Sequence, residues 1–316
     1  GIEYRVDALN AFVLVLVSLV ASIVAPYART SVAAELPRDQ HYLFFTMYSL
    51  CLAGLLGITI TGDVFNLFVF LEIASLSTYV LIALGRDRRA LLAAYQYLVL
   101  GTIGATFYII GVGLLYLMTG TLNLADLALR LRDVHEIRPV LAALAFITVG
   151  IGLKLALFPL HFWLPNAYTY APSAITAFLA ATATKVSVYV LLRFYFSVFG
   201  VQLVFARLPM AEILIALSVL AVVSASLVAV FQRDLKRMFA YSSVAQIGYI
   251  TLGAGLANEP GLTGAVVHLF NHGLTKGAIF LLLGGIAMRV GSTNLERAAG
   301  LAKTMPLTSF GIVLGG

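Results

Sequence analysis

Hydrophobic runs of about 20 residues, separated by short polar connections, recur along nearly the whole chain. An α-helix of that length crosses the hydrocarbon core of a bilayer. The pattern predicts about ten such segments, at about residues 8–27, 42–61, 61–84, 91–118, 140–158, 173–199, 211–231, 240–257 and 262–288, with the last one starting at 306. We therefore expect an all-α polytopic membrane protein.

Two connections depart from the simple pattern. The stretch from Thr119 to Arg138 is more polar and predicts a short amphipathic helix at the membrane surface. The connection from Pro159 to Pro165 is aromatic and nearly uncharged, and it directly follows a hydrophobic segment. Because proline removes a helical hydrogen bond, this connection predicts a broken membrane helix near Pro159, a feature typical of transporter ion sites.

Basic residues predict which loops face the cytoplasm, because lysine and arginine are enriched there. One alternate set of connections carries Arg29, Arg38, Arg86, Arg88, Arg89, Arg233, Lys236, Arg237, Arg289, Arg297 and Lys303. The other set carries Arg130, Arg132, Arg138 and Arg207, with Arg193 near a helix end. We expect the first set on the cytoplasmic side and Gly1 on the outer side.

Composition supports the membrane assignment and excludes several functions. Hydrophobic residues make up 61% of the chain and charged residues 11%, whereas ordinary domains carry about 25% charged residues. The net charge of +6 is spread over the loops, which argues against nucleic-acid binding. The lone Cys51 excludes a disulfide framework. We find no motif for a metal site, a cofactor or covalent catalysis, and we expect a transporter subunit rather than an enzyme.

The chain reads as one transmembrane domain, residues 1–316, of a longer protein. It begins at Gly1 without a methionine and stops at Gly316 within a hydrophobic run. We expect no cleavable signal peptide, since the first apolar run lacks a basic flank and a small-residue cleavage site.

Glu72 is the first candidate functional residue. It lies in the middle third of the apolar stretch from Thr61 to Leu84, where a carboxylate costs roughly 2.5–3.5 kcal/mol on insertion scales. Pairing with a lysine would lower that cost, and Lys154, Lys185 and Lys276 all lie within hydrophobic segments. The residues alone do not say which lysine is the partner. In the turn at the start of the same stretch, Asp63 is predicted to be a helix N-cap.

A second group of titratable residues lies on a single later segment. His268, His272 and Lys276 are spaced four residues apart, which places them along one stripe of a helix. Histidine exchanges protons near neutral pH, so the stripe is suited to a proton relay. The competing interpretation of these three residues is a polar stripe that joins neighbouring helices. For Lys154, the competing interpretation is a side chain near the helix end that extends to the membrane surface.

Four motifs resemble one family of membrane proteins: TGDVFNLFVFLEI, GLKLALFPLHFWLPNAYTYAPSAITAFL, RDLKRMFAYSSVAQIGY and HLFNHGLTKGAIF. They are similar to the proton-conducting antiporter-like subunits of Mrp-type cation/proton antiporters, respiratory complex I and membrane-bound hydrogenases. The first motif resembles in particular the D-type subunits of Mrp antiporters. Leu179 and Ala180 stand where A-type relatives have a histidine, which also favours the D type.

The resemblance implies a fold with two inverted repeats, each with one broken helix. The first would cover about residues 42–199, and the second would start near residue 211 and be truncated at 316. It further implies that Glu72 pairs with Lys154, that Lys185 comes next along a hydrophilic axis, and that His268, His272 and Lys276 form a central link.

These observations lead to one main hypothesis and two alternatives. The main hypothesis is proton translocation in a multisubunit Na+/proton antiporter of the cell membrane. Its expected partners are other antiporter subunits, the lipid bilayer, protons and sodium, with no nucleic acid. The first alternative is an antiporter-like subunit of a redox-driven pump. The second is a structural scaffold whose buried charges only fix helix packing.

Overall fold

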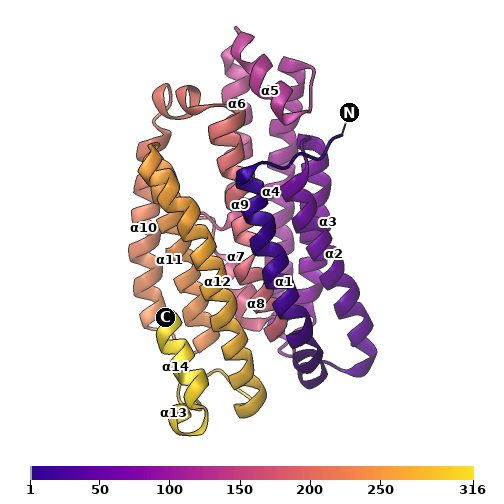
Figure 1. Cartoon of the computed structure of the whole chain (residues 1–316), viewed down its shortest axis with the longest axis vertical. Coiled ribbons are helices and arrows are strands. Elements are labelled where there is room, and N and C mark those ends of the chain that lie inside the picture. The colour runs from indigo at the N-terminus through magenta and orange to yellow at the C-terminus, as the bar shows by residue number, and fades with distance from the viewer. Residues whose placement is uncertain (1) are drawn as a thin grey trace.

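A computed structural model describes residues 2–316 and shows a bundle of helices that run along the long axis of the molecule (Figure 1). The longer elements are α1 (Ala8–Glu35), α2 (His41–Ile60), α3 (Val64–Ala83), α4 (Arg89–Thr119), α6 (Ile137–Leu155), α10 (Met210–Val230), α11 (Leu235–Gly255) and α12 (Glu259–Val290). The shorter elements are η1 (Arg38–Gln40), α5 (Leu124–Arg130), η2 (Leu131–Asp133), α7 (Trp163–Tyr170), α8 (Ser173–Ala181), α9 (Ala183–Leu192), η3 (Arg193–Val198), η4 (Gln202–Ala206), α13 (Leu301–Thr304) and α14 (Pro306–Gly315).

Each of the ten expected segments contains a helix. Eight helices within residues 2–316 are long and apolar enough to cross a membrane. The other two expected segments correspond to α11, which begins with Leu235, Lys236 and Arg237, and to the short α14. The architecture is therefore that of an all-α, multi-pass membrane protein, as the sequence predicts.

The first helix is longer than the sequence predicts. We expected it to end near Tyr27, but α1 continues through Pro26 to Glu35. Ala28, Ser31 and Val32 in the added part are buried against neighbouring helices. Tertiary packing thus outweighs the local cost of the proline.

The centre of the bundle is formed by α8 and α9. Within the apolar part of Ser173–Val198, 94% of the residues are buried, the largest share among the candidate membrane-spanning segments. Helices α1 and α12 pack against α8, and α6 and α2 pack against α9. This central position brings the α8–α9 segment next to helices from both halves of the chain.

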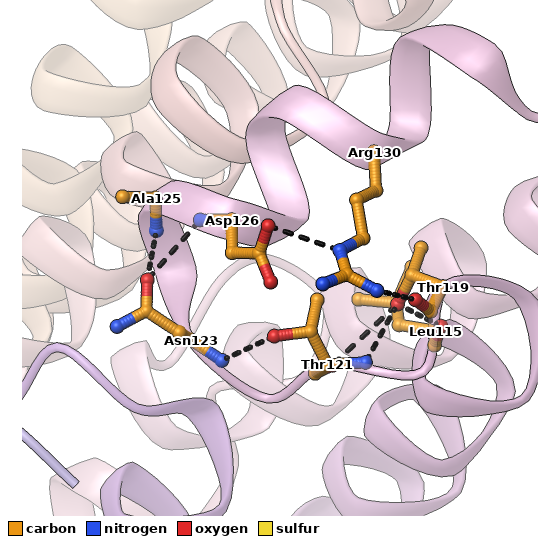
Figure 2. Close-up of polar contacts among 7 residues, drawn as sticks. All are labelled: Leu115, Thr119, Thr121, Asn123, Ala125, Asp126 and Arg130. Atoms are coloured by element: carbon orange, nitrogen blue, oxygen red, sulfur yellow. Dashed lines mark hydrogen bonds and ion pairs between the residues drawn. The ribbon is translucent and has the colours of Figure 1, made fainter. Parts of the chain in front are cut away.

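At the N-terminal end, short backbone bridges tie the helix starts together. Tyr4 pairs with Thr61, and Asp63 pairs with Asn123. Asp63 accepts hydrogen bonds from Phe65 N and Asn66 N, so it is the helix N-cap that the sequence predicts. The expected short surface helix is α5, which Asn123 caps (Figure 2).

The opposite end carries the first set of basic connections. Ser173 N donates to Glu35 Oε2 at 3.0 Å, and Lys236 Nζ donates to Ala171 O at 2.9 Å. These contacts join the end of α1, the α7–α8 connection and the start of α11. Asp234 and Asn294 form a bridge at the same end, with the same number of residues between them as between Asp63 and Asn123.

Candidate functional site

The fifth hydrophobic segment is broken in front of Pro159, as predicted. Helix α6 ends at Leu155, and Ala156 adopts a left-handed conformation with φ of 61°. The carbonyl of Leu153, freed by this ending, accepts a hydrogen bond from Trp163 Nε1 at 2.8 Å. The Trp163 indole, at the start of α7, therefore supplies a hydrogen-bond donor to the end of α6. Lys154 lies in the last turn of α6.

Lys154 and Glu72 face each other, with the lysine buried and the glutamate side chain 28% exposed. Lys154 is only 5% exposed, which excludes the interpretation that it extends to the membrane surface. Its Nζ lies 3.9 Å from Glu72 Oε1 and donates a hydrogen bond to Ser75 Oγ at 2.6 Å. Glu72 Oε1 is buried and has no hydrogen-bond partner among the described residues. The lysine on α6 is thus the neighbour of Glu72, but its short contact is with Ser75.

Tyr79 and Gly101 complete the surroundings of this pair. The Tyr79 hydroxyl is buried without a hydrogen-bond partner in residues 2–316. A Cβ placed on Gly101 would clash with that hydroxyl and would lie 3.4 Å from Lys154 Nζ. Glycine at this position of α4 therefore leaves room for a tyrosine and a lysine from two other helices.

Lys185 lies at a second helix break that the sequence did not reveal. We expected one helix from residue 173 to about 199, but Thr182 separates α8 from α9 with φ of −122° and ψ of −55°. Lys185 is 1% exposed and donates to the carbonyl of Ala180 and to Thr184 Oγ1. The amine thus bonds to a carbonyl immediately before the break.

The predicted stripe on α12 is present and faces α11. The rings of His268 and His272 are stacked with centroids 6.0 Å apart. His268 Nε2 lies 2.7 Å from Gln246 Oε1, and Lys276 Nζ donates to Ser242 Oγ at 2.8 Å. The three stripe residues line a cavity of about 200 Å³ together with these α11 side chains. Polar cavities of this size hold water.

His272 connects the stripe to the centre of the bundle. Its two ring nitrogens are buried and have no hydrogen-bond partner in the described part of the chain. A Cβ on the adjacent Gly273 would lie 3.0 Å from Ala181 O, so this turn of α12 packs against the α8–α9 break. Lys185 follows the same break on α9 and therefore lies near this turn of α12.

The six predicted residues therefore form two groups. One is Glu72 with Lys154, and the other is the α12 stripe with Lys185 next to it. No hydrogen bond within residues 2–316 joins Lys185 to the first group. Likewise, no cluster of three His, Cys, Asp or Glu side chains that could hold a metal occurs in these residues.

Four neighbouring residues were not predicted as site residues: Ser75, Tyr79, Ser242 and Gln246. Ser75 and Tyr79 follow Glu72 by three and seven residues, which places them on the same face of α3. Gln246 is an amide within an apolar segment. These signals exist in the sequence, but they do not identify the lysine or histidine to which Ser75, Ser242 and Gln246 bond.

Comparisons with known proteins show the family to which the chain belongs. Residues 61–316 match the family model described as NADH:quinone oxidoreductase/Mrp antiporter, TM. The chain is 45% identical to the N subunit of the NADH-quinone oxidoreductase of Desulforudis audaxviator, covering 98% of this chain and 61% of that protein. It is 33% identical to the D subunit of the Na(+)/H(+) antiporter of Alkalihalophilus pseudofirmus, with 97% and 61% covered. The chain thus spans about 61% of the length of these relatives.

Solved structures show the same fold. A chain of an archaeal membrane-bound sulfane sulfur reductase matches with a TM-score of 0.90 and 36% identity, covering 100% of this chain and 63% of the other. A chain of the Mrp complex from Dietzia matches with a TM-score of 0.87 and 30% identity, with 100% and 57% covered. Together with the eight apolar helices found in residues 2–316, these matches establish a multi-pass protein of the cell membrane that belongs to the NADH:quinone oxidoreductase/Mrp antiporter transmembrane family.

Proposed function

We propose that this chain translocates protons across the membrane as a subunit of a multisubunit cation/proton antiporter, with sodium as the exchanged cation. The observation that carries the proposal is the contact between Glu72 and Lys154 beside the helix break. Protons would pass between water and buried titratable side chains. The distance between the carboxylate and the amine would control when Lys154 holds its proton.

The position of Ser75 supports this switching role. Lys154 Nζ is in hydrogen-bond contact with Ser75 but not with Glu72. The lysine therefore has two partners of different charge within reach. A move of about 1 Å toward Glu72 would exchange the neutral hydroxyl for a charge-assisted hydrogen bond, which is roughly twice as strong.

The second group would carry the proton onward. Lys185, His272 and Lys276 lie around the α8–α9 break, and His268 continues the stripe toward Gln246. The cavity along the stripe is polar and suited to water. We assign Lys185, His268, His272 and Lys276 to the onward path.

We also propose that the chain holds one complete repeat, about residues 42–199, and the start of a second one from about residue 211. The matching bridges Asp63–Asn123 and Asp234–Asn294 support this division. They lie at opposite ends of the bundle, at the starts of α3 and α11, as expected for repeats of inverted orientation.

A second candidate function rests on the 45% identity to a subunit of an NADH-quinone oxidoreductase. In this case the chain would move protons in a complex powered by electron transfer. The partners would then be redox subunits instead of antiporter subunits. The proposed proton path through this chain is the same for both candidate functions, which differ in the energy source and in the partner subunits.

The test uses everted membrane vesicles that contain the full-length protein in its complex. Added Na+ should dissipate a preformed pH gradient, and Glu72→Ala or Lys154→Ala should abolish this response. A response to a quinone-reducing electron donor but not to Na+ would favour the second candidate. Full activity of both alanine variants would exclude either function for this site and would favour a structural scaffold.

A further inference from the structure

A cavity of about 360 Å³ lies at the end of the molecule where the N-terminal segment crosses the turn between α2 and α3. Its lining includes Glu3, Arg5, Asp7, Asn10, Tyr189 and Arg193. None of the six residues of the proposed proton path lines this cavity. It therefore needs its own explanation.

Asp7 and Arg193 form an ion pair across the cavity. Arg193 Nη1 lies 2.7 Å from Asp7 Oδ2, and Arg193 Nη2 donates to Asp7 Oδ1 at 2.9 Å. This two-point contact is the strongest geometry that a carboxylate and a guanidinium adopt. Asp7 also caps α1, because Oδ1 accepts from Leu9 N and Asn10 N. The carboxylate is thus held in place by the start of α1, so the arginine is the partner that must turn when the pair separates.

Arg193 lies over Tyr189, which is one helical turn from the buried Lys185. Its guanidinium carbon lies 5.2 Å from the centre of the Tyr189 ring, and its Nε lies 3.4 Å from the Tyr189 hydroxyl. Tyr189 in turn follows Lys185 by four residues on α9, so the two side chains lie on one face, one turn apart. Lys185, Tyr189 and Arg193 therefore form a stripe that leads from the helix break to the cavity.

The wall opposite Arg193 is fixed. Arg5 N donates to Ile60 O, and Gly62 N donates to Glu3 O. Asn123 Nδ2 donates to Glu3 Oε1 at 2.8 Å. Because the N-terminal segment is attached to two other elements, separation of Asp7 and Arg193 requires a side-chain rotation and no movement of the segment.

We propose that this cavity is a water-filled vestibule that connects Lys185 to the outer side of the membrane, and that the Asp7–Arg193 ion pair is its gate. When the pair is formed, Arg193 lies over the Tyr189 ring in the wall of the cavity and restricts access to the Tyr189 hydroxyl. When the pair separates, water and hydrated protons reach the Tyr189 hydroxyl, one turn from Lys185. The inference rests on the proposed proton path, because the vestibule leads to one of its residues.

Thiol accessibility tests the gate without measuring transport. Thr61 lines the cavity and is 3% exposed, so Thr61→Cys is a reporter inside the closed vestibule. The full-length protein in its complex is labelled in intact cells with a membrane-impermeant maleimide. Asp7→Asn removes the charge but keeps a good N-cap. It should increase the labelling rate about tenfold, as expected for loss of a charge-assisted hydrogen bond.

Matched controls separate the gate from a general loosening. Asp126→Asn removes a similar carboxylate at the same end, where Asp126 bonds to Arg130 outside the cavity lining (Figure 2). This variant should leave the Thr61→Cys rate within about twofold of the parent, since an exposed pair contributes little. Ser197→Cys, at the exposed mouth, should be labelled at the same rate with and without Asp7→Asn.

The outcomes are decisive in both directions. Faster labelling of Thr61→Cys from the outside in Asp7→Asn, and again in Arg193→Gln, supports the gated vestibule. An unchanged rate in both variants, or labelling only in everted vesicles, overturns it. Because labelling does not depend on proton movement, a complex without antiport activity would still report on the vestibule. Failure of the proposed function is therefore distinguishable from failure of this inference.

Discussion

Lys154 Nζ lies 3.9 Å from Glu72 Oε1, which is a contact between charges and too long for a hydrogen bond. Ser75, one turn along α3 from Glu72, takes the hydrogen bond of the lysine instead. Glu72 Oε1 remains buried without a partner among residues 2–316. The hydrogen bond to Ser75 therefore keeps Lys154 out of hydrogen-bond contact with Glu72, and a substitution of Ser75 can test its role.

Replacement of Ser75 should change the activity without destroying it. Ser75→Ala removes the competing acceptor, so Lys154 should bind Glu72 more tightly and release its proton more slowly. We expect the initial rate of Na+-dependent proton movement to fall roughly threefold to tenfold, the effect of one hydrogen bond. Fluorescence of a pH-sensitive dye in everted vesicles measures this rate.

The control is Ser77→Ala on the same helix. Ser77 is also buried, but its hydroxyl donates to the carbonyl of Ile73 and does not contact Lys154. Equal rates for the parent and Ser77→Ala are expected. If Ser75→Ala behaved like Ser77→Ala, the hydroxyl would have no part in the switch.

A methyl group at Gly101 should disturb the site by steric contact. In Gly101→Ala the added Cβ would clash with the Tyr79 hydroxyl, so the tyrosine must move within the space around Lys154. We expect a loss of stability of about 1–3 kcal/mol, typical of overpacking, together with reduced proton movement. Thermal unfolding of the purified complex and the vesicle assay measure the two effects.

Gly113 provides the matched control on the same helix. A Cβ at Gly113 meets no atom within 4 Å. Gly113→Ala should leave the unfolding temperature and the transport rate close to those of the parent. A similar loss in both variants would show that α4 tolerates no alanine for reasons unrelated to Lys154.

Gln246 should matter because of His268. Its Oε1 lies 2.7 Å from His268 Nε2 and orients the ring that stacks on His272. Gln246→Leu leaves that nitrogen without its partner, and we expect proton movement to fall about tenfold, the cost of an unsatisfied polar group. Gln232→Leu serves as the control, since the Gln232 side chain bonds to the carbonyl of Val228, away from the stripe. Unchanged transport in Gln246→Leu would remove His268 from the path.

The ion pair at the N-terminal end predicts an acid dependence of stability. The hydrogen bond from Arg193 holds the pKa of Asp7 below its ordinary value of 3.8. A lowered pKa means that the pair stabilises the folded protein above about pH 4 and loses this contribution as the pH falls through the lowered pKa. Arg193→Gln should therefore unfold at a lower temperature than the parent at pH 7. The difference should shrink toward about pH 3, and a constant difference would contradict this account.

Particular residues show how far the sequence predicts this site. Glu72 was evident because a carboxylate within an apolar run is costly, and the break near Pro159 was evident because proline cannot continue a helix. The stripe from His268 to Lys276 follows from helical periodicity alone. These features depend on residue type and spacing, which the sequence contains.

Other features depend on packing between distant segments. Thr182 has no proline or glycine beside it, so nothing in the sequence marks the α8–α9 break. Ala156 adopts a left-handed conformation that alanine rarely takes. The contacts of Ser75 with Lys154 and of Asp7 with Arg193 join residues far apart in the chain. Such pairs are defined only when the helices are placed in space.

The central claim is that Lys154 carries protons, and its most direct test is Lys154→Met in the full-length complex reconstituted into proteoliposomes. Methionine keeps a long side chain but cannot hold a proton. With assembly confirmed by size-exclusion chromatography, we predict loss of Na+-driven proton movement in Lys154→Met and parental rates in Lys303→Met, where the lysine is exposed. Proton movement at the parental rate in Lys154→Met would contradict the account.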